Sequence, residues 1–381
     1  MATFPGSVNL LKDKLVKFEI DREMEIPGNL IEKLRSQVPL SEKTERLTDE
    51  QLEVIYKQKW FKLFVPQEFN GLNLSLPDGL MLQESLAKID GSLGWTVTLC
   101  SGATMFIGYL DLDIAKELFY DMKVCFGGSG RASGKAEIIQ DGYLISGKWQ
   151  YATGASHNTV FTANCELVED NKTLLNEAGT PVVKSFMFLR QEVKLAQDWD
   201  AMGLKATSSD TFSVKELKVK KDRAFEINTQ CTTLNNLIYR FPFRQFAETT
   251  LAVNTLGMTL RFLELSNEIL TKKQTVVNNQ SQSSAETHKV LLLNANGELS
   301  QLKKSFYAEV NKSWLQLQAT NVIEEDLLEI ISITSRKLVK KSLKWVSQLY
   351  PYCGMSAARP SEEINRVWRN IFTASQHSIF L

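Results

Sequence analysis

Histidines are the side chains of this chain that most readily move protons, and there are only three of them. His157 ends the segment GKWQYATGASH, and His377 ends RVWRNIFTASQH, four positions before the last residue. An imidazole has an ordinary pKa of about 6.5, so it can give or take a proton near neutral pH. The alternatives are a loop histidine satisfied by backbone groups for His157 and a surface histidine at a helix C-terminus for His377. His288 has no motif around it and is predicted to lie on the surface.

The cysteines are the other groups with metal or redox chemistry. There are five, an odd number, and they are scattered without a CxxC spacing. Zinc sites and disulfide frameworks usually show short, repeated spacings. The pattern therefore predicts reduced thiols in a cytoplasmic protein without a metal site. The residues are Cys100, Cys125, Cys165, Cys231 and Cys353.

Charge and hydropathy exclude several classes of partner. Lys+Arg and Asp+Glu both total 44, so no net charge attracts nucleic acid or an anionic membrane. The chain has no apolar run of about 18 residues, as a membrane span needs. Its first residues lack the apolar core of a secretory signal. We therefore expect a cytoplasmic protein that binds neither nucleic acid nor membrane.

Three regions of different periodicity must position these side chains, and together they predict an α+β fold. Residues 1–120 repeat apolar residues at helical spacing, as in DEQLEVIYKQKWFKLF, and predict an N-terminal helical domain. Residues 121–228 alternate apolar and polar residues around an Asp141-Gly142 hairpin signal, which predicts a small β-barrel or sandwich. Residues 229–381 hold four long amphipathic stretches, which predict a four-helix bundle with a mobile polar loop between Thr271 and Thr287.

This order of helices, strands and helices resembles the acyl-CoA dehydrogenase superfamily of flavoproteins. Five segments in the right order are similar to its motifs: FKLFVPQEFNGL, LAKIDGSLGW, GYLISGKWQYATGASH, WDAMGLKATSSDTFSVKELKV and YCGMSAARPSEEINRVWRN. The histidine segments, GKWQYATGASH and NIFTASQH, are most similar to its branch of two-component monooxygenases. Members of that branch take reduced flavin from a partner reductase and use O2 to hydroxylate a bound substrate.

The resemblance implies an FAD or FMN site on the β-region. Trp149 would form a planar wall for the flavin, although its alternative is a place in the core. Thr153 and the backbone around Tyr151 would hydrogen-bond the flavin edge. Ser129 and Ser133 belong to the glycine-rich FGGSGRASG, whose backbone amides could approach a ligand closely, unless it is simply a turn.

The resemblance also implies roles for charged and catalytic residues. Arg244, with Arg240 beside it, would meet a flavin phosphate, and Arg369 would be a further cofactor-binding residue. Surface positions are the alternative for Arg240 and Arg244. His157 and His377 would be catalytic. A neutral His377 beside the flavin could deprotonate a phenol or stabilise a peroxide oxygen.

The dehydrogenases of the superfamily need a glutamate base, and this chain offers no clear one. Counted from Arg369-Asn370, the usual glutamate falls on Ser378, and Asn370 replaces the usual aspartate. A second placement falls next to Glu248, which at a helix start is more often solvated or paired with the dipole. The glycine-rich loop also lacks the Thr-Glu-Pro-Gly of the dehydrogenases.

Oxygenation of a small organic or aromatic substrate with reduced flavin is therefore the leading interpretation. An acyl-CoA dehydrogenase that desaturates an acyl thioester is the first alternative, and a catalytically silent binding module of the same fold is the second. A flavin reductase is the expected partner of the oxygenase. The fold also implies a homo-oligomer, either a dimer or a tetramer.

Overall fold

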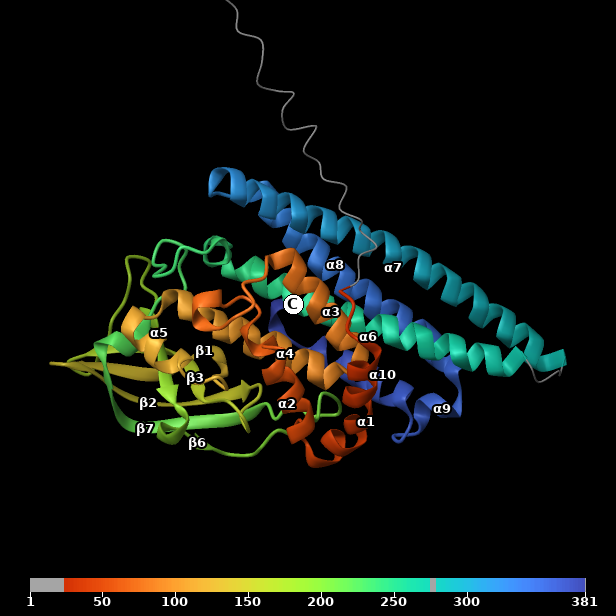
Figure 1. Ribbon diagram of the computed structural model, residues 1–381, viewed down its shortest axis with the longest axis horizontal. Helices are drawn as coiled ribbons and strands as arrows, with labels where there is room; N and C mark the ends of the chain where they lie inside the picture. The colour runs from red at the N-terminus through yellow and green to blue at the C-terminus, as the bar shows by residue number, and fades with distance from the viewer. Residues whose placement is uncertain (1–23, 275–278, 381) are drawn as a thin grey trace, which may run out of the picture.

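The computed structural model describes residues 24–274 and 279–380. Along the described residues, helices precede and follow a central group of strands, so the predicted α+β fold class is confirmed (Figure 1). Among the described residues, no helix is long and apolar enough to cross a membrane.

The N-terminal region is helical where the apolar periodicity predicted it. Side chains cap the helices: Thr48 and Gln51 form a capping box at the start of the second, and the Ser75 hydroxyl accepts from the backbone N–H of Asp78 at the start of the third. Asp90 accepts from the backbone N–H of Leu93 and so begins the fourth. The helices are α1 (Gly28–Thr44), α2 (Asp49–Lys57), α3 (Leu76–Ile89), α4 (Gly91–Thr104) and α5 (Leu112–Phe119).

The middle region is one mixed sheet in the order β6-β7-β2-β1-β3-β5-β8, with β4 beside β3. Only the β1–β3 pair is parallel, and the predicted hairpin is confirmed because Ile139 pairs with Gly142. The strands are β1 (Phe126–Ile139), β2 (Gly142–Ala152), β3 (Val160–Glu169), β4 (Lys172–Thr173), β5 (Val183–Leu189), β6 (Lys194–Leu195), β7 (Asp210–Lys220) and β8 (Ala224–Phe225).

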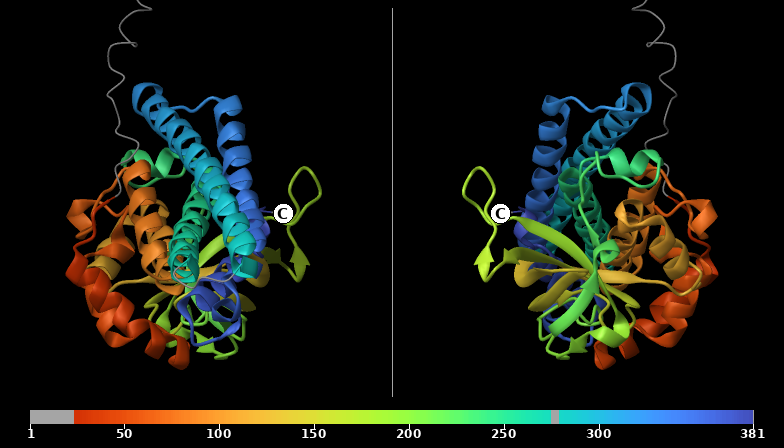
Figure 2. Two further views of the ribbon diagram at one scale, coloured as in Figure 1. Left: turned by 90° about the vertical axis from the view of Figure 1, so that its right-hand side faces the viewer. Right: turned by 90° about the vertical axis from the view of Figure 1, so that its left-hand side faces the viewer.

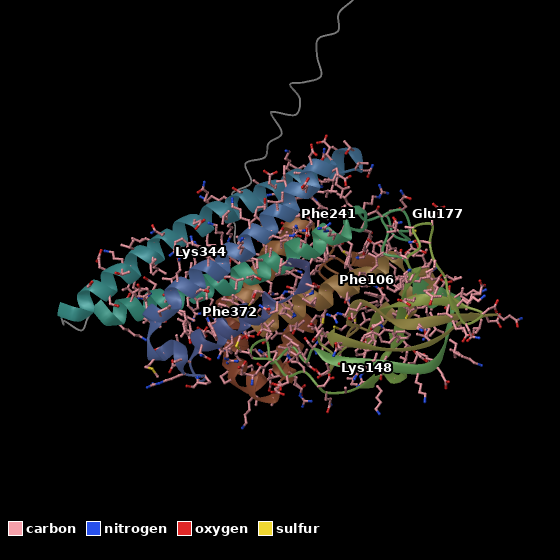
Figure 3. All side chains as sticks on the ribbon, turned by 180° about the vertical axis from the view of Figure 1, so that it is seen from behind. Phe106, Lys148, Glu177, Phe241, Lys344 and Phe372 are labelled. Carbon is pink, nitrogen blue, oxygen red and sulfur yellow. The ribbon has the colours of Figure 1, made fainter. Side chains whose placement is uncertain are left out.

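The sheet curls around its own apolar core rather than stacking on a second sheet. Trp149 on β2 and Phe188 on β5 lie with ring centroids 5.7 Å apart, although two strands separate β2 from β5 in the sheet. Only curvature brings such strands together. In the described part of the chain the edge strands β6 and β8 do not pair with each other, so the curl stays open. The segment between β3 and β5 projects from the molecule, with Glu177 at its tip (Figures 2 and 3).

The C-terminal region contains the helices α6 (Phe243–Gln274), α7 (Asn279–Thr320), α8 (Glu325–Leu349), α9 (Met355–Ala358) and α10 (Glu363–Ala374). The predicted loop between Thr271 and Thr287 is wrong over most of its length, because helices cover all of it except residues 275–278, which lie outside the described residues. The segment has no proline or glycine, and its polar residues cost a helix little.

His288 on α7 also corrects a prediction. Its side chain is buried rather than at the surface, and its Nε2 lies 2.7 Å from the hydroxyl of Ser266 on α6. The ring stacks against Tyr352. The histidine therefore serves helix packing, where a polar partner satisfies its buried nitrogen.

The N-terminal helices join the sheet to the bundle. α3 packs along α6, and α4 contacts both β1 and α6 (Figure 1). An ion pair between Asp90 Oδ2 and Arg366 Nε, 3.7 Å apart, connects the start of α4 to α10. This junction brings the end of the chain toward the sheet.

Candidate functional site

A cavity of about 380 Å³ lies where β1 and β3 face α4 and the first turns of α6. This volume falls within the usual range of small-molecule pockets, about 300–1,000 Å³. Phe106, which Figure 3 labels, lies in this region between the helices and the sheet. Of the described residues, those that line the cavity include no Asp, Glu, Lys or Arg.

The sheet side of the cavity is polar and small. The backbone of the glycine-rich residues 127–130 of β1 forms part of this side. The hydroxyl and amide side chains that line the cavity here are Ser129, Thr153, Thr162, Asn164 and Ser185. Some of these groups are already oriented, because Ser185 donates to Asn164 Oδ1 at 2.7 Å and Asn164 Nδ2 donates to the Gly130 carbonyl at 2.9 Å. An added Cβ at Gly130 would meet no atom within 4 Å, so the backbone there is open to a ligand.

The helix side of the cavity is mainly apolar. Its apolar lining residues are Leu99, Phe106, Phe243, Phe246 and Leu251, and Thr98 and Thr250 add hydroxyl groups. The apolar residues cannot be separated from ordinary core residues in the sequence, since aromatic and aliphatic side chains at helical spacing look alike in both roles. A flavin is a flat ring system that needs hydrogen-bond donors from the protein along one edge. A polar wall that faces an apolar wall suits such a ring, so the residues present fit a flavin.

His377 closes the cavity from the end of the chain. Its Nδ1 accepts from the backbone N–H of Ile379 at 3.3 Å, which leaves the proton of a neutral ring on Nε2. The ring contacts Trp95 edge-on, with centroids 6.1 Å apart. Burial lowers the pKa of His377 below its ordinary value. A neutral imidazole that can exchange a proton through Nε2 therefore faces the cavity.

The lowered pKa gives a pH dependence with a definite sign. A histidine that folding keeps neutral stabilises the native state fully at pH values above its pKa in the unfolded chain. This stabilisation is lost as the pH falls through the lower pKa of the folded protein. We expect the ring of His377 to titrate below about 6.5 in the native protein. NMR of the ring protons, assigned with a His377→Gln spectrum, measures it. A midpoint above the value found in the unfolded chain would contradict the burial argument.

His157 lies away from the cavity lining. Its ring stacks on Phe61, with centroids 5.3 Å apart, and one of its nitrogens lies within 4.8 Å of the Cys100 and Cys125 sulfurs. Thr153, four residues earlier, does line the cavity, and its hydroxyl lies 3.0 Å from that of Ser209. The segment 152–159 therefore presents its threonine to the cavity and its histidine to the interior.

The planar wall expected from Trp149 needs correction. The indole is fully buried in the sheet core, stacks on Phe212 with centroids 5.1 Å apart, and donates to the Asn164 carbonyl. It has no free face for a flavin. Tyr151 is the aromatic on this strand that a ligand can reach, since it is 55% exposed and has a φ of 67°. Such backbone strain is often kept for function.

The remaining residues predicted to bind the cofactor also lie outside the cavity lining. Ser133 is exposed and donates to the Lys148 carbonyl at 2.8 Å. Arg369 is occupied by the protein, because it donates to Glu42 on α1 and to the Met202 carbonyl, both at 2.6 Å. Its expected role in cofactor binding stays a prediction. Arg244 is 67% exposed at the start of α6, where a ligand phosphate could still reach it.

Glu248 differs from the solvated helix-start residue that the sequence suggested. Its side chain is fully buried, and its Oε1 accepts from Arg336 on α8 at 2.6 Å and from Arg244 at 3.4 Å. It does not line the cavity. In the described part of the chain the cavity thus has no carboxylate that could remove a C–H proton, which a dehydrogenase needs.

Asn370, where the resemblance led us to expect aspartate, has a structural use. Its Oδ1 accepts from the backbone N–H of Leu204 at 2.7 Å, and the side chain is fully buried. Thr373, one turn further along α10, accepts from the N–H of Gly203. These two bonds fix α10 to the segment before β7, and α10 ends three residues before His377.

Comparisons with known proteins agree with the resemblance read from the sequence. Residues 249–381 match the family described as Acyl-CoA dehydrogenase, C-terminal domain. The indole-3-acetate monooxygenase of Acinetobacter baumannii is 21% identical over 86% of this chain and 82% of its own length. The oxygenase subunit HsaA of a flavin-dependent monooxygenase from Mycobacterium tuberculosis is 21% identical over 92% of this chain and 89% of its own.

Solved structures share the fold. The HsaA monooxygenase from M. tuberculosis superimposes with a TM-score of 0.83 at 20% identity, over 92% of this chain and 93% of that chain. XiaF from Streptomyces, solved in complex with FADH2 and glycerol, superimposes with a TM-score of 0.79 at 18% identity, over 92% and 89%. The likeness to the acyl-CoA dehydrogenase superfamily, and to its monooxygenase branch in particular, is therefore confirmed.

Proposed function

We propose that this chain, a protein of the acyl-CoA dehydrogenase fold, is the oxygenase component of a two-component flavin-dependent monooxygenase. One observation supports it most: His377 closes a cavity that has a polar sheet side, an apolar helix side and no carboxylate among its described lining residues. Reduced FAD or FMN, delivered by a reductase and bound there, would supply the electrons for the reaction with O2. The relatives named as monooxygenases support the same assignment.

The chain's own residues would divide the work between the two sides. The hydroxyls of Ser129 and Thr153 and the backbone of residues 127–130 would hold the polar edge of the flavin. The phenylalanines of the opposite side would exclude water and hold the substrate ring. His377 would take a proton from, or give one to, the substrate through Nε2. Arg244 would reach a phosphate of the cofactor, and Tyr151 would offer a face at its margin.

Incorporation of oxygen from O2 into the product distinguishes this function from its alternatives. Chemically reduced FMN or FAD is mixed with the protein, a phenol and isotopically labelled O2, and the product is analysed by mass spectrometry. The proposal predicts one labelled oxygen atom in the product. Reduction of a bound oxidised FAD by acyl-CoA would favour the dehydrogenase instead. Failure to bind flavin in either state would favour the silent binding module.

We infer further that the substrate carries no charge. A carboxylate that enters the cavity would lose its hydration without meeting a lysine or arginine in the described lining. We expect kcat/KM to be at least about tenfold higher for phenol than for p-hydroxyphenylacetate, and for indole than for indole-3-acetate, since tenfold corresponds to only ~1.4 kcal/mol. Equal values within either matched pair would show that a cation does reach the site.

Self-association is part of the proposal. The long helices α7 and α8 leave large apolar side chains exposed, among them Leu293, Leu315, Ile330 and Ile333. Exposed apolar side chains on neighbouring helices favour contact between copies. We expect a dimer or a tetramer, measurable by light scattering, and a cytoplasmic location beside the reductase.

A further inference from the structure

Three residues from separate segments converge behind the cavity. Cys100 lies on α4, Cys125 directly precedes β1, and His157 follows β2. Their two sulfurs and an imidazole nitrogen all lie within 4.8 Å of one another. We propose that Cys100, Cys125 and His157 form a buried site for Zn²⁺ or a similar soft divalent ion. Nothing in the proposed oxygenase chemistry requires this site, so it stands apart from that proposal.

The donor set and its spacing suit tetrahedral zinc. Structural zinc sites combine thiolates at about 2.3 Å with imidazole or oxygen ligands at about 2.0–2.2 Å, which separates neighbouring donors by about 3.6 Å. Asn158 Oδ1 lies 3.6 Å from Cys100 Sγ and 3.4 Å from Cys125 Sγ. The amide oxygen therefore stands where a fourth ligand would complete the coordination.

His157 supplies a second observation. Both of its ring nitrogens are buried, and neither has a hydrogen-bond partner among the described residues. A buried polar atom without a partner is costly, and a bound ion is one of the recognised explanations for it. The stack on Phe61 fixes the plane of the ring. A metal ion would use one nitrogen as a ligand and remove part of this cost.

Gly154 shows how closely the donors gather. An added Cβ there would lie 2.8 Å from Cys100 Sγ, 2.9 Å from His157 Nε2 and 2.9 Å from Asn158 Oδ1. The residue also has a φ of 78°, which glycine adopts without strain. Both the close contacts and the positive φ therefore require glycine here. Because it has no side chain, the sulfur, nitrogen and oxygen donors can gather around one point.

The charge of the donors also suits a divalent cation. Zn²⁺ would bind both sulfurs as thiolates and release the thiol protons to solvent. Two thiolates neutralise the ion, so the buried cluster would carry no net charge.

The site would act as a cross-link beside the cavity. It ties α4, the start of β1 and the segment 152–159 together. Cys100 Sγ also lies 3.6 Å from the carbonyl oxygen of Thr153, whose side chain lines the cavity. A bound ion would thus stabilise the fold and hold Thr153 in place.

Cobalt titration of the full-length protein tests the site directly. The reduced protein is treated with a chelator, freed of it and titrated with Co²⁺. We expect one equivalent to produce a thiolate-to-cobalt charge-transfer band and the visible bands of a tetrahedral ion, and one equivalent of Zn²⁺ to displace it. We also expect zinc to raise the midpoint of thermal unfolding. Wild-type protein that gives neither the bands nor the shift would overturn the proposal.

Matched cysteine variants locate the ligands. Cys125→Ser should lose the charge-transfer intensity of one thiolate, and Cys100→Ser should do the same. Cys165→Ser removes an equally buried thiol outside the cluster and should leave the spectrum unchanged. Bands that survive both cluster variants would overturn the site, as would a Cys100–Cys125 disulfide that persists with excess zinc under reducing conditions. The wild-type titration decides the matter even if a variant fails to fold.

Discussion

His377→Ala should lower the rate of product formation by about 10²–10⁴-fold while reduced flavin still binds. Proton transfer by a positioned side chain typically contributes this much. The side chain lines the cavity, its Nδ1 is held by the Ile379 amide, and burial keeps it neutral by lowering its pKa. Single-turnover mixing of the reduced, flavin-loaded protein with O2 and a phenol measures the rate.

Two companion measurements separate chemistry from folding. His377→Gln keeps a hydrogen-bond donor but cannot accept and return a proton, so it should bind flavin like the wild type and still lose most of the rate. Oxygen uptake should continue in both variants without a matching yield of product. If His377→Ala kept product formation within about threefold of the wild type, the histidine would have no part in proton transfer.

Arg336→Met should destabilise the protein by up to about 3–5 kcal/mol, the usual cost of leaving a buried charge without its partner. The Arg336 side chain is 36% exposed, but the Glu248 carboxylate that would lose it is fully buried. Glu248 is fully buried, and its Oε2 has no partner even in the native structure. Without Arg336 its carboxylate would keep only Arg244, whose side chain is 67% exposed and 3.4 Å away. Denaturant unfolding, followed by circular dichroism, gives the difference in free energy.

Arg244→Met is the matched control for that measurement. It removes an arginine from the same glutamate, but an exposed pair is worth only about 0–1 kcal/mol. The double variant Glu248→Leu/Arg336→Met should recover much of the loss, because it removes the uncompensated charge together with its partner. Equal losses in the two arginine variants would mean that Arg336 does not compensate the buried carboxylate.

Local patterns in the sequence predicted most of the fold. The helical periodicity of the N-terminal region, the hairpin signal at Asp141-Gly142 and the change of period near residue 121 all correspond to elements of the structure. The predicted polar loop was wrong because polar composition alone does not end a helix when proline and glycine are absent. Curling of the sheet depends on contacts between distant strands, which no local pattern records.

Trp149 and Tyr151 show why parts of the site could not be predicted. Regular alternation puts both residues on one face of a strand. The pairing of β2 with β7 shifts between Trp149 and Ala152, and Tyr151 adopts a positive φ. One ring therefore enters the core while the other faces solvent. A single sequence does not reveal such a bulge, so it does not show which of the two rings is buried.

Contacts between segments far apart in the chain determine which of the other predicted residues line the cavity. Thr153 and His377 stand far apart in the chain and do line one cavity, as the motifs that contain them suggested. His157 belongs to the same motif as Thr153 but faces Cys100 and Cys125 instead. That cluster draws its ligands from three segments, so it has none of the short spacings by which metal sites are recognised in a sequence.

Anaerobic binding of reduced flavin is the measurement that tests the central claim most directly. Reduced FMN and FAD are titrated into wild-type protein, into Ala247→Trp, which fills the cavity from α6, and into Asn294→Trp on α7, which does not line it. The account predicts one reduced flavin per chain, bound more tightly than the oxidised form, with affinity at least about tenfold weaker in Ala247→Trp and unchanged in Asn294→Trp. Equal affinity in all three proteins, or tighter binding of the oxidised form, would contradict it.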